Sequence, residues 1–326
     1  MTSTAENTRH AGQSLGAWLA WRVLRGIGLF ACATLALFAL VQALPGDAAT
    51  VSAGRHGEAA VEAAREAMGL DAPVLARYFD WLSGFVRGDL GTTLVTGVPV
   101  SQTLITPVIS TLTVAAIVFA GLFLIALPVS IYAGARPSRF TRVSHGLATI
   151  VTAMPEFVVG ILAVFVLAQV LGWLPVLSVP GPGRTVWQAP TALIMPSLCL
   201  WILCAASLFR RVRALVSTYA NTAYVKDAYL SGLPPRTVLF HHLLPTASYP
   251  ICQLFVQMIP YLLGGTVVIE TVTSFPGVGY SLIGAINNRD VPVVMGIGGA
   301  LIAVTTIAYI LADFIGKRFE RIAAVI

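Results

Sequence analysis

Residues 221–245 read NTAYVKDAYLSGLPPRTVLFHHLLP and form a polar stretch between two long apolar runs. Nine residues separate Gly232 from His242, and Pro245 closes the stretch. A helix-forming polar segment of this length has little reason to persist in so apolar a chain unless a partner docks on it. We predict a short helix over residues 224–231, a left-handed turn at Gly232 and a second helix from Thr237 onward, because glycine allows that turn and the proline pair that follows disfavours helix before it.

The composition of the whole chain indicates a membrane protein. Of its 326 residues, 57% are hydrophobic and only 10% are charged, and the mean hydropathy is +0.83. A soluble domain carries about 25% charged residues. The net charge of +6 does not indicate a nucleic-acid partner, because the arginines stand at the ends of apolar runs rather than in one patch. The four cysteines lie in apolar stretches without metal-site spacing, so neither a metal site nor a disulfide framework is expected.

Six apolar runs are long enough to cross a bilayer, which takes about 20 residues of helix. They cover residues 18–44, 108–134, 145–172, 190–212, 247–269 and 291–316. In lipid each backbone polar group needs a partner within its own segment, so the runs must be helices. The predicted fold class is therefore an all-α membrane protein with six transmembrane helices.

The distribution of lysine and arginine predicts how these spans are oriented in the membrane. Of the 20 lysines and arginines, 14 flank the spans on the side that holds both termini and residues 221–245. Because lysine and arginine concentrate on the cytoplasmic side of a membrane, both termini and residues 221–245 are expected to be cytoplasmic. The predicted parts are an N-terminal tail (1–17), a first transmembrane helix (18–44), an external amphipathic segment (45–107), a five-helix core (108–316) that includes residues 221–245, and a C-terminal tail (317–326).

The external segment is expected to contain two short amphipathic helices. Val61, Ala64 and Met68 mark the first at helical spacing. The second begins after residues 71–73, and its apolar face consists of Val74, Tyr78, Leu82 and Phe85. We expect these helices to form a lid or shoulder on the outer surface, and a solvated spacer is the alternative.

The chain lacks the motifs of ATP binding and of common hydrolases. Its one Gly-Lys pair, at residues 316–317, is followed by arginine and lacks the glycine pattern of a P-loop. Neither a GxSxG nor an HExxH motif occurs. The chain is therefore not expected to be an enzyme or to hold a cofactor itself, and an intramembrane enzyme is disfavoured.

Glu156 is the only acidic residue deep within a predicted span. An unpaired carboxylate is costly in lipid, so its side chain should face the bundle interior or water. It either lines a translocation path, where it would meet an amine or a metal complex, or packs between helices, bonded to a hydroxyl or protonated. Glu270 and Asp313 stand near span ends and are expected to have interface or packing roles. His241 and His242 diverge on a helix, so a contact role is expected rather than a shared metal.

Several short motifs resemble those of a known family. They are LPGD at 44–47, MGLD at 68–71, RGDLG at 87–91, LGWLPV at 171–176, ETV at 270–272, FPGVG at 275–279 and RDVPV at 289–293. Together they resemble permeases of ABC importers of the dipeptide, oligopeptide and nickel type, the binding-protein-dependent transport system inner-membrane components. The likeness covers nearly the whole chain. It implies an external gate or family motif that includes Glu270, Pro276 and Gly277.

The polar stretch resembles the signature of these permeases, which reads EAA, three residues, glycine, nine residues and I-x-L-P. Aligned on Gly232, residues 226–228 stand for EAA and residues 242–245 for the end of the signature. The glutamate, first alanine and isoleucine positions depart from the pattern. The resemblance implies that the stretch couples to an ATPase through Tyr224, Lys226, Asp227, Ala228, Gly232, Leu244 and Pro245.

The resemblance also implies partners and an activity. It implies a half-pore of the type I ABC importer permease fold that pairs with a second, homologous permease in the bacterial cytoplasmic (inner) membrane. Two cytoplasmic ATPase subunits would bind ATP and magnesium, and an extracytoplasmic solute-binding protein would deliver the substrate for import by alternating access. Di- or oligopeptides are the implied substrates, with nickel or a metal–chelator complex as the alternative. A proton-coupled secondary transporter is a further alternative, but it needs intramembrane ionisable relays, and only Glu156 lies deep.

Overall fold

The computed structural model describes residues 15–53, 56–136, 138–181 and 183–323. These residues are almost entirely helical, and the one β pairing among them is an isolated antiparallel bridge between Thr92 and Pro99. The predicted all-α fold class is confirmed. The predicted tails fall partly on residues 1–14 and 324–326, which lie outside the described residues.

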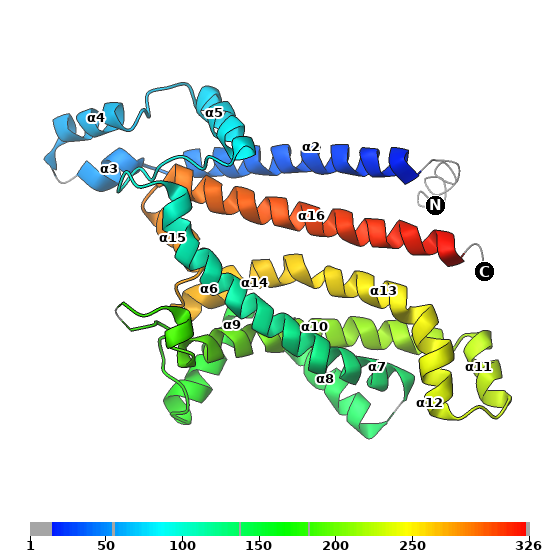
Figure 1. The fold of residues 1–326 in the computed structure, drawn as a ribbon. Helices are drawn as coiled ribbons and strands as arrows, with labels where there is room; N and C mark the ends of the chain where they lie inside the picture. Colours follow the sequence, from blue (N-terminus) through cyan, green and yellow to red (C-terminus); the bar gives the residue numbers. More distant parts are fainter. Residues whose placement is uncertain (1–14, 54–55, 137, 182, 324–326) are drawn as a thin grey trace.

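Within the described residues the fold contains five long apolar helical stretches, and Figure 1 shows most of them running roughly along one axis, whereas the helix over residues 100–121 crosses the others obliquely. They are α2 (Leu15–Gln42), α6 (Val100–Gly121) with η2 (Leu122–Ala126) and α7 (Leu127–Ala135), α10 (Thr191–Ala220), α13 (Leu244–Val256) with α14 (Met258–Val272), and α16 (Val291–Ala323). Each is long and apolar enough to cross a membrane.

The remaining predicted span is bent. Helices α8 (Arg139–Ala153) and α9 (Glu156–Val164) meet at 106°, so they make a sixth span only as a broken pair. The break follows from Pro155, because proline disfavours helical geometry in the residue before it, and Met154 is extended with ψ of 141°. The prediction of one helix over residues 145–172 is therefore corrected to two helices, with the π-helical η3 (Phe165–Val170) continuing α9.

Several other spans run further than predicted, among them α6, which begins at Val100 rather than at residue 108. α10 continues to Ala220, eight residues beyond the predicted end at 212. This extension places Arg213 on the same helix as Arg210 and Arg211, which stand at the end of the predicted span. α16 continues to Ala323 and so includes most of the predicted C-terminal tail.

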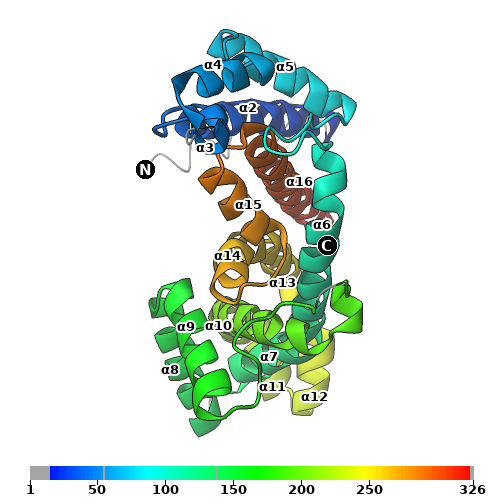
Figure 2. The same ribbon diagram turned by 90° about the vertical axis from the view of Figure 1, so that its left-hand side faces the viewer.

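Helix α10 is the centre of the fold. In its most apolar window 72% of the residues are buried, compared with 17% in α2. Figure 2 shows α10 with α7, α8, α9 and α14 around it. The main hydrophobic cluster includes Met195, Leu200 and Leu208 of α10 and extends into α13 and α14. The burial of these side chains is what holds the surrounding helices in place.

A close approach joins α7 to α10 at Gly134. An added Cβ atom there would lie 2.6 Å from the Cβ of Val216 and 2.8 Å from the carbonyl oxygen of Arg213. We expect Gly134→Ala to lower the free energy of unfolding by about 1–3 kcal/mol, since the backbone oxygen cannot move aside. The thermal aggregation midpoint of the detergent-solubilised protein should fall by several degrees. Gly146→Ala is the control, because nothing lies within 4 Å of its added Cβ; equal midpoints for the two variants would contradict this packing.

The external segment contains α3 (Ala48–Ala53), α4 (Glu58–Ala67) and α5 (Val74–Arg87), so both predicted helices are confirmed. Figure 2 shows α4 and α5 crossing over α2. Tyr78 is buried, and its hydroxyl donates to the carbonyl oxygen of Ala31 on α2 at 3.1 Å. The rings of Trp81 and Phe85 pack over Gly299 of α16. These contacts support a packed shoulder rather than a solvated spacer.

The carboxylates of two motif residues, Asp47 and Asp290, hold this external segment in place through hydrogen bonds. The carboxylate of Asp47, from LPGD, accepts hydrogen bonds from the Thr50 amide at 2.8 Å and from Arg65 Nε at 3.0 Å. Burial opposes ionisation, but these hydrogen bonds and the Arg65 charge hold the pKa of Asp47 below its usual value. Asp290, from RDVPV, is buried and accepts from the Leu94 amide at 3.2 Å, and burial raises its pKa.

Candidate functional site

The polar stretch folds as two helical pieces around a turn. α11 (Ala223–Leu230) is followed by Gly232 with φ of +79°, and then by α12 (Pro235–Thr237) and the π-helical η5 (Val238–Leu243), which runs into α13. The predicted helix, turn and second helix are confirmed. Figure 1 places α11 and α12 at the same end of the molecule as the start of α2 and the end of α16.

One side of this stretch is anchored in the core. Val225, Val238 and Leu243 are fully buried, and Ala228 is nearly so. All four belong to the main hydrophobic cluster that surrounds α10. A displacement of α11 must therefore move the packed ends of α10 and α13 with it, because closely packed interiors transmit strain.

The other side presents apolar side chains to solvent. Leu230 is 85% exposed, the largest exposed fraction among the large hydrophobic residues of the described chain. Tyr224, Tyr229 and Phe240 are also exposed. Sequence reasoning named Tyr224 but missed the other three. The sequence did contain a cue to them, because several large apolar residues stand in a short polar segment that cannot bury all of them. Exposed apolar patches of this kind mark interaction sites.

The residues named from the signature take different positions. Lys226, Asp227, Gly232 and Pro245 are exposed, Leu244 is half-buried and Ala228 is buried. His242 contacts Tyr224: its Nδ1 lies 2.9 Å from the Tyr224 hydroxyl, and the ring centroids are 5.3 Å apart. His242 therefore makes a contact within the chain, and the contact role expected for His241 stays a prediction. This bond joins η5 to α11 at a position where the family pattern has isoleucine.

Glu270 lies at a second junction, between α14, α6 and α15 (Val278–Asn287). Its side chain is fully buried and accepts hydrogen bonds from Thr111 Oγ1 at 2.6 Å and from the Gly279 amide at 2.7 Å. Thr111 Oγ1 in turn accepts from the Val278 amide at 2.8 Å. The carboxylate therefore ties three helices together, which is the predicted packing role.

The FPGVG turn wraps this carboxylate closely. A Cβ atom on Gly277 would lie 2.3 Å from the Glu270 carboxyl carbon, so only glycine fits there. Pro276 precedes it and is half-buried. Asp313, the other acid near a span end, pairs with Arg22 at 2.7 Å and joins α16 to α2. Its predicted packing role is also confirmed.

Glu156 begins α9 directly after the bend, and it is half-buried. Its Oε2 lies 3.6 Å from the position of an added Cβ on Gly265 of α14. Close by, a cavity of about 600 Å³ opens between α8, α10 and α14. Its lining residues are His145, Thr152, Ser207, Arg210, Arg211, Ala214 and Tyr261. Sequence reasoning found Glu156 but missed this cavity, because the cavity depends on how α8, α10 and α14 pack against one another.

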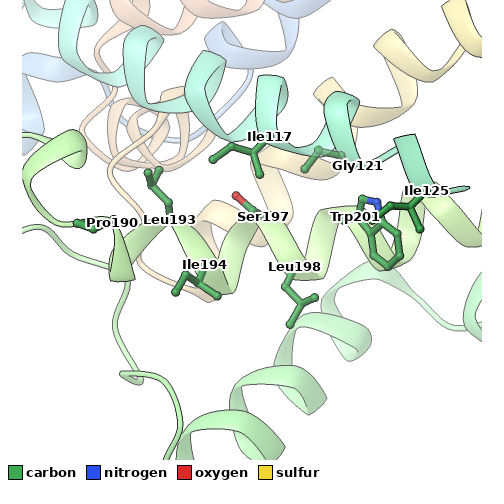
Figure 3. A pocket seen from close by; sticks show the side chains of 10 residues that line it. Ile117, Gly121, Ile125, Pro190, Leu193, Ile194, Ser197, Leu198 and Trp201 are labelled. Carbon is green, nitrogen blue, oxygen red and sulfur yellow. The ribbon is translucent and has the colours of Figure 1, made fainter. Parts of the chain in front are cut away.

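A second cavity, of about 530 Å³, lies between α6 and α10 and is almost wholly apolar (Figure 3). Ile117 and Ile125 from α6 and η2 face Leu193 and Trp201 from α10 across it. An added Cβ on Gly121 would meet the Trp201 indole nitrogen at 2.6 Å. This groove holds no charged side chain and so offers no group for acid–base or ionic recognition.

Comparison with known proteins identifies the family. Residues 126–322 match the family model "Binding-protein-dependent transport system inner membrane component", and residues 17–101 match its N-terminal companion. The oligopeptide transport system permease protein AppB of Bacillus subtilis is 30% identical over 317 residues, 94% of this chain and 100% of AppB. The probable peptide ABC transporter permease protein y4tP of Sinorhizobium fredii is 30% identical over 284 residues, 86% of this chain and 90% of y4tP. The glutathione transport system permease protein GsiC of Pectobacterium atrosepticum is 32% identical over 263 residues, 79% of this chain and 82% of GsiC. The chain therefore belongs to the family of binding-protein-dependent transport system inner membrane components, which are multi-pass membrane permeases.

Proposed function

We propose that this protein is the pore-forming permease subunit of an ATP-driven ABC importer that moves di- or oligopeptides across the cytoplasmic membrane. The observation that carries the proposal is α11–η5, which is anchored in the core on one side and presents exposed apolar residues on the other. The peptide substrate is supported by similar permeases whose names specify peptides, oligopeptides and glutathione.

The proposed orientation places both termini and α11 in the cytoplasm. Two observations support it. Most lysines and arginines flank the spans on this side. The start of α2, the end of α16 and α11 also lie at one end of the molecule, and α3 and α4 lie at the other (Figure 1). In this orientation α11 is reachable by a cytoplasmic ATPase, and the shoulder α3–α5 by an extracytoplasmic solute-binding protein.

In the proposed cycle, two partner ATPase subunits bind ATP with magnesium and close on each other. Their motion is passed to α11 through the exposed Leu230 and Tyr224, and from α11 to α10 and α13 through the buried Val225 and Val238. The half-pore of this chain then tilts against that of a second, homologous permease and exposes the path to the outside. Hydrolysis restores the inward-open state.

We place the translocation path beside Glu156 and the cavity between α8, α10 and α14. Support comes from the charge: an acid half-buried in a spanning segment is expected to face a polar interior. The Glu270 junction lies at the outer end of α14, where it holds α15 and the FPGVG turn. We propose that this junction, with Pro276 and Gly277, is the rigid part of the external gate.

The test is reconstitution of the complete transporter, with both permeases, both ATPases and the binding protein, in liposomes. Labelled di- and tripeptides should accumulate only when ATP is present on the ATPase side. Nickel–chelator complexes, offered in parallel, should not accumulate. Accumulation driven by a proton gradient in vesicles that lack the ATPase subunits would contradict the proposal, and ATP-driven uptake of the nickel complex alone would contradict its substrate.

A further inference from the structure

We infer that the cavity between α8, α10 and α14, together with the neighbouring Glu156, which is not among its lining residues, forms a subsite that binds both charged ends of a peptide. Arg211 takes the free carboxylate, and Glu156 takes the terminal ammonium group. The inference rests on the proposed function, and it adds a chemical selection by the permease itself.

The cavity has the size and composition of a small-molecule site. Its volume of about 600 Å³ falls within the range of about 300–1,000 Å³ typical of such sites. Its polar groups converge from three helices: Thr152 from α8, Arg211 from α10 and Tyr261 from α14. The groove in Figure 3 is of similar size, yet it has no charged side chain. Of these two cavities, only the one between α8, α10 and α14 is lined by charged side chains.

The two principal charges of this region are not neutralised by the protein. Within the described residues, neither Arg211 nor Glu156 has an ion pair or a hydrogen-bond partner. Arg210 is different, because its NH1 donates to Thr152 Oγ1. The Nδ1 of His145 is buried and has no hydrogen-bond partner. A ligand with charges of the opposite signs would pair with both groups, and the pairing would relieve Glu156 in particular, because an unpaired carboxylate is costly within a membrane span.

Both charges lie near Tyr261. This side chain is within electrostatic range of Glu156 and of Arg211. Gly265 lies one helical turn further along α14, and a Cβ atom added there would be 3.6 Å from Glu156 Oε2. Arg211 and Tyr261 line the cavity, and Glu156 lies near Tyr261, so a cation and an acid flank the same region. A zwitterion matches this pair of charges, since both of its ends would form charge-assisted hydrogen bonds.

The test crosses two residue changes with two substrate changes. Uptake of a tripeptide with free ends, of its C-terminal amide and of its N-acetyl form is measured with the complete transporter in liposomes at saturating binding protein. The permease variants are Arg211→Gln and Glu156→Gln. The binding protein is the same throughout, so its own preference cancels when a variant is compared with the unsubstituted transporter for the same peptide.

For each variant, uptake should no longer depend on whether the peptide end that the substituted residue binds is free or modified. Arg211→Gln is expected to lower uptake of the free tripeptide about tenfold, or about 1.4 kcal/mol, and to leave uptake of the amide within about twofold. Glu156→Gln should likewise lower uptake of the free tripeptide about tenfold and leave uptake of the N-acetyl form within about twofold. Arg211→Lys, which keeps the charge, should retain most uptake and shows that the site tolerates substitution. Arg139→Gln, an exposed arginine on α8 outside the cavity, should change nothing.

Three results decide the matter. If Arg211→Gln lowers uptake of the acid and the amide by the same factor, the arginine serves a gate or a lipid phosphate and the inference is overturned, while peptide import stands. If the unsubstituted transporter imports no peptide, the proposed function itself fails and the inference falls with it. If the binding protein rejects a modified peptide, thermal stabilisation of the detergent-solubilised complex by the three peptides replaces uptake. The same crossed pattern is then expected, and stabilisation by none of them overturns the inference.

Discussion

Replacing Gly277 with alanine is expected to reduce the amount of folded protein in the membrane at least fivefold. The added Cβ would lie 2.3 Å from the Glu270 carboxyl carbon, well inside van der Waals contact. The carboxylate cannot move aside without breaking its hydrogen bonds to Thr111 Oγ1 and the Gly279 amide. Overpacking costs about 1–3 kcal/mol, and loss of a hydrogen bond to a charged buried group costs about 1.5–3 kcal/mol more. Fluorescence-detected size exclusion of the solubilised complex measures the folded amount.

The matched control for this change is Gly284→Ala on α15. Nothing lies within 4 Å of its added Cβ, and alanine favours helix over glycine. The folded yield of Gly284→Ala should equal or exceed that of the unsubstituted chain. If Gly277→Ala behaves like Gly284→Ala, the close wrapping of the FPGVG turn around Glu270 is not what holds this junction.

Gly232→Asp is expected to lower ATP-dependent uptake at least tenfold and to leave membrane insertion and folded yield nearly unchanged. Gly232 has φ of +79°, a conformation that aspartate tolerates better than most residues. No atom of the chain lies within 4 Å of an added Cβ, so the new side chain points into open space. The chain itself can therefore accept it, whereas a partner pressed against this turn cannot. Uptake and stimulated ATP hydrolysis in proteoliposomes are the measurements.

Two further variants separate docking from local strain. Gly232→Asn has similar bulk and tolerance of positive φ without the charge, and it should also lower uptake if bulk at an interface is the cause. Gly88→Asp provides the same change at φ of +83° and ψ of 7°, again with no atom within 4 Å, in the external segment. Its uptake should stay within about twofold of normal. Normal uptake by Gly232→Asp, or equal losses for both positions, would count against a coupling role for the turn.

Local sequence rules predicted much of α11 and its surroundings. Gly232 and the proline pair set the turn, and the apolar runs set the long helices, because both signals depend on neighbouring residues alone. The signature pointed to Lys226 and Asp227, which are exposed in the structure. It did not point to Leu230, whose exposure depends on which face of α11 meets the core. The burial of Val225 and Ala228 determines that face, and this burial depends on tertiary packing rather than on neighbouring residues.

The candidate path was harder to predict. Glu156 stood out because a carboxylate is unusual in an apolar run. Its surroundings depend on a 106° bend between α8 and α9 and on how α8, α10 and α14 pack together. Pro155 gave a reason for a break, yet the angle is set by how α9 packs on α14 and α10. The closeness of Gly277 to Glu270 was also beyond the sequence, since it arises where a turn folds back on the end of its own helix.

The central claim is that α11 is the surface on which a partner ATPase docks. A photo-crosslinking amino acid at position 230 tests it most directly, because Leu230 is 85% exposed and nothing in the described chain covers it. In membranes that contain the complete transporter, irradiation is predicted to join this chain to the ATPase subunit, and the yield should change when the ATPases are trapped in the ATP-bound state. The same probe at position 57, in the external segment, should give no ATPase adduct. Absence of an adduct at position 230, or an equal adduct at position 57, would contradict the account.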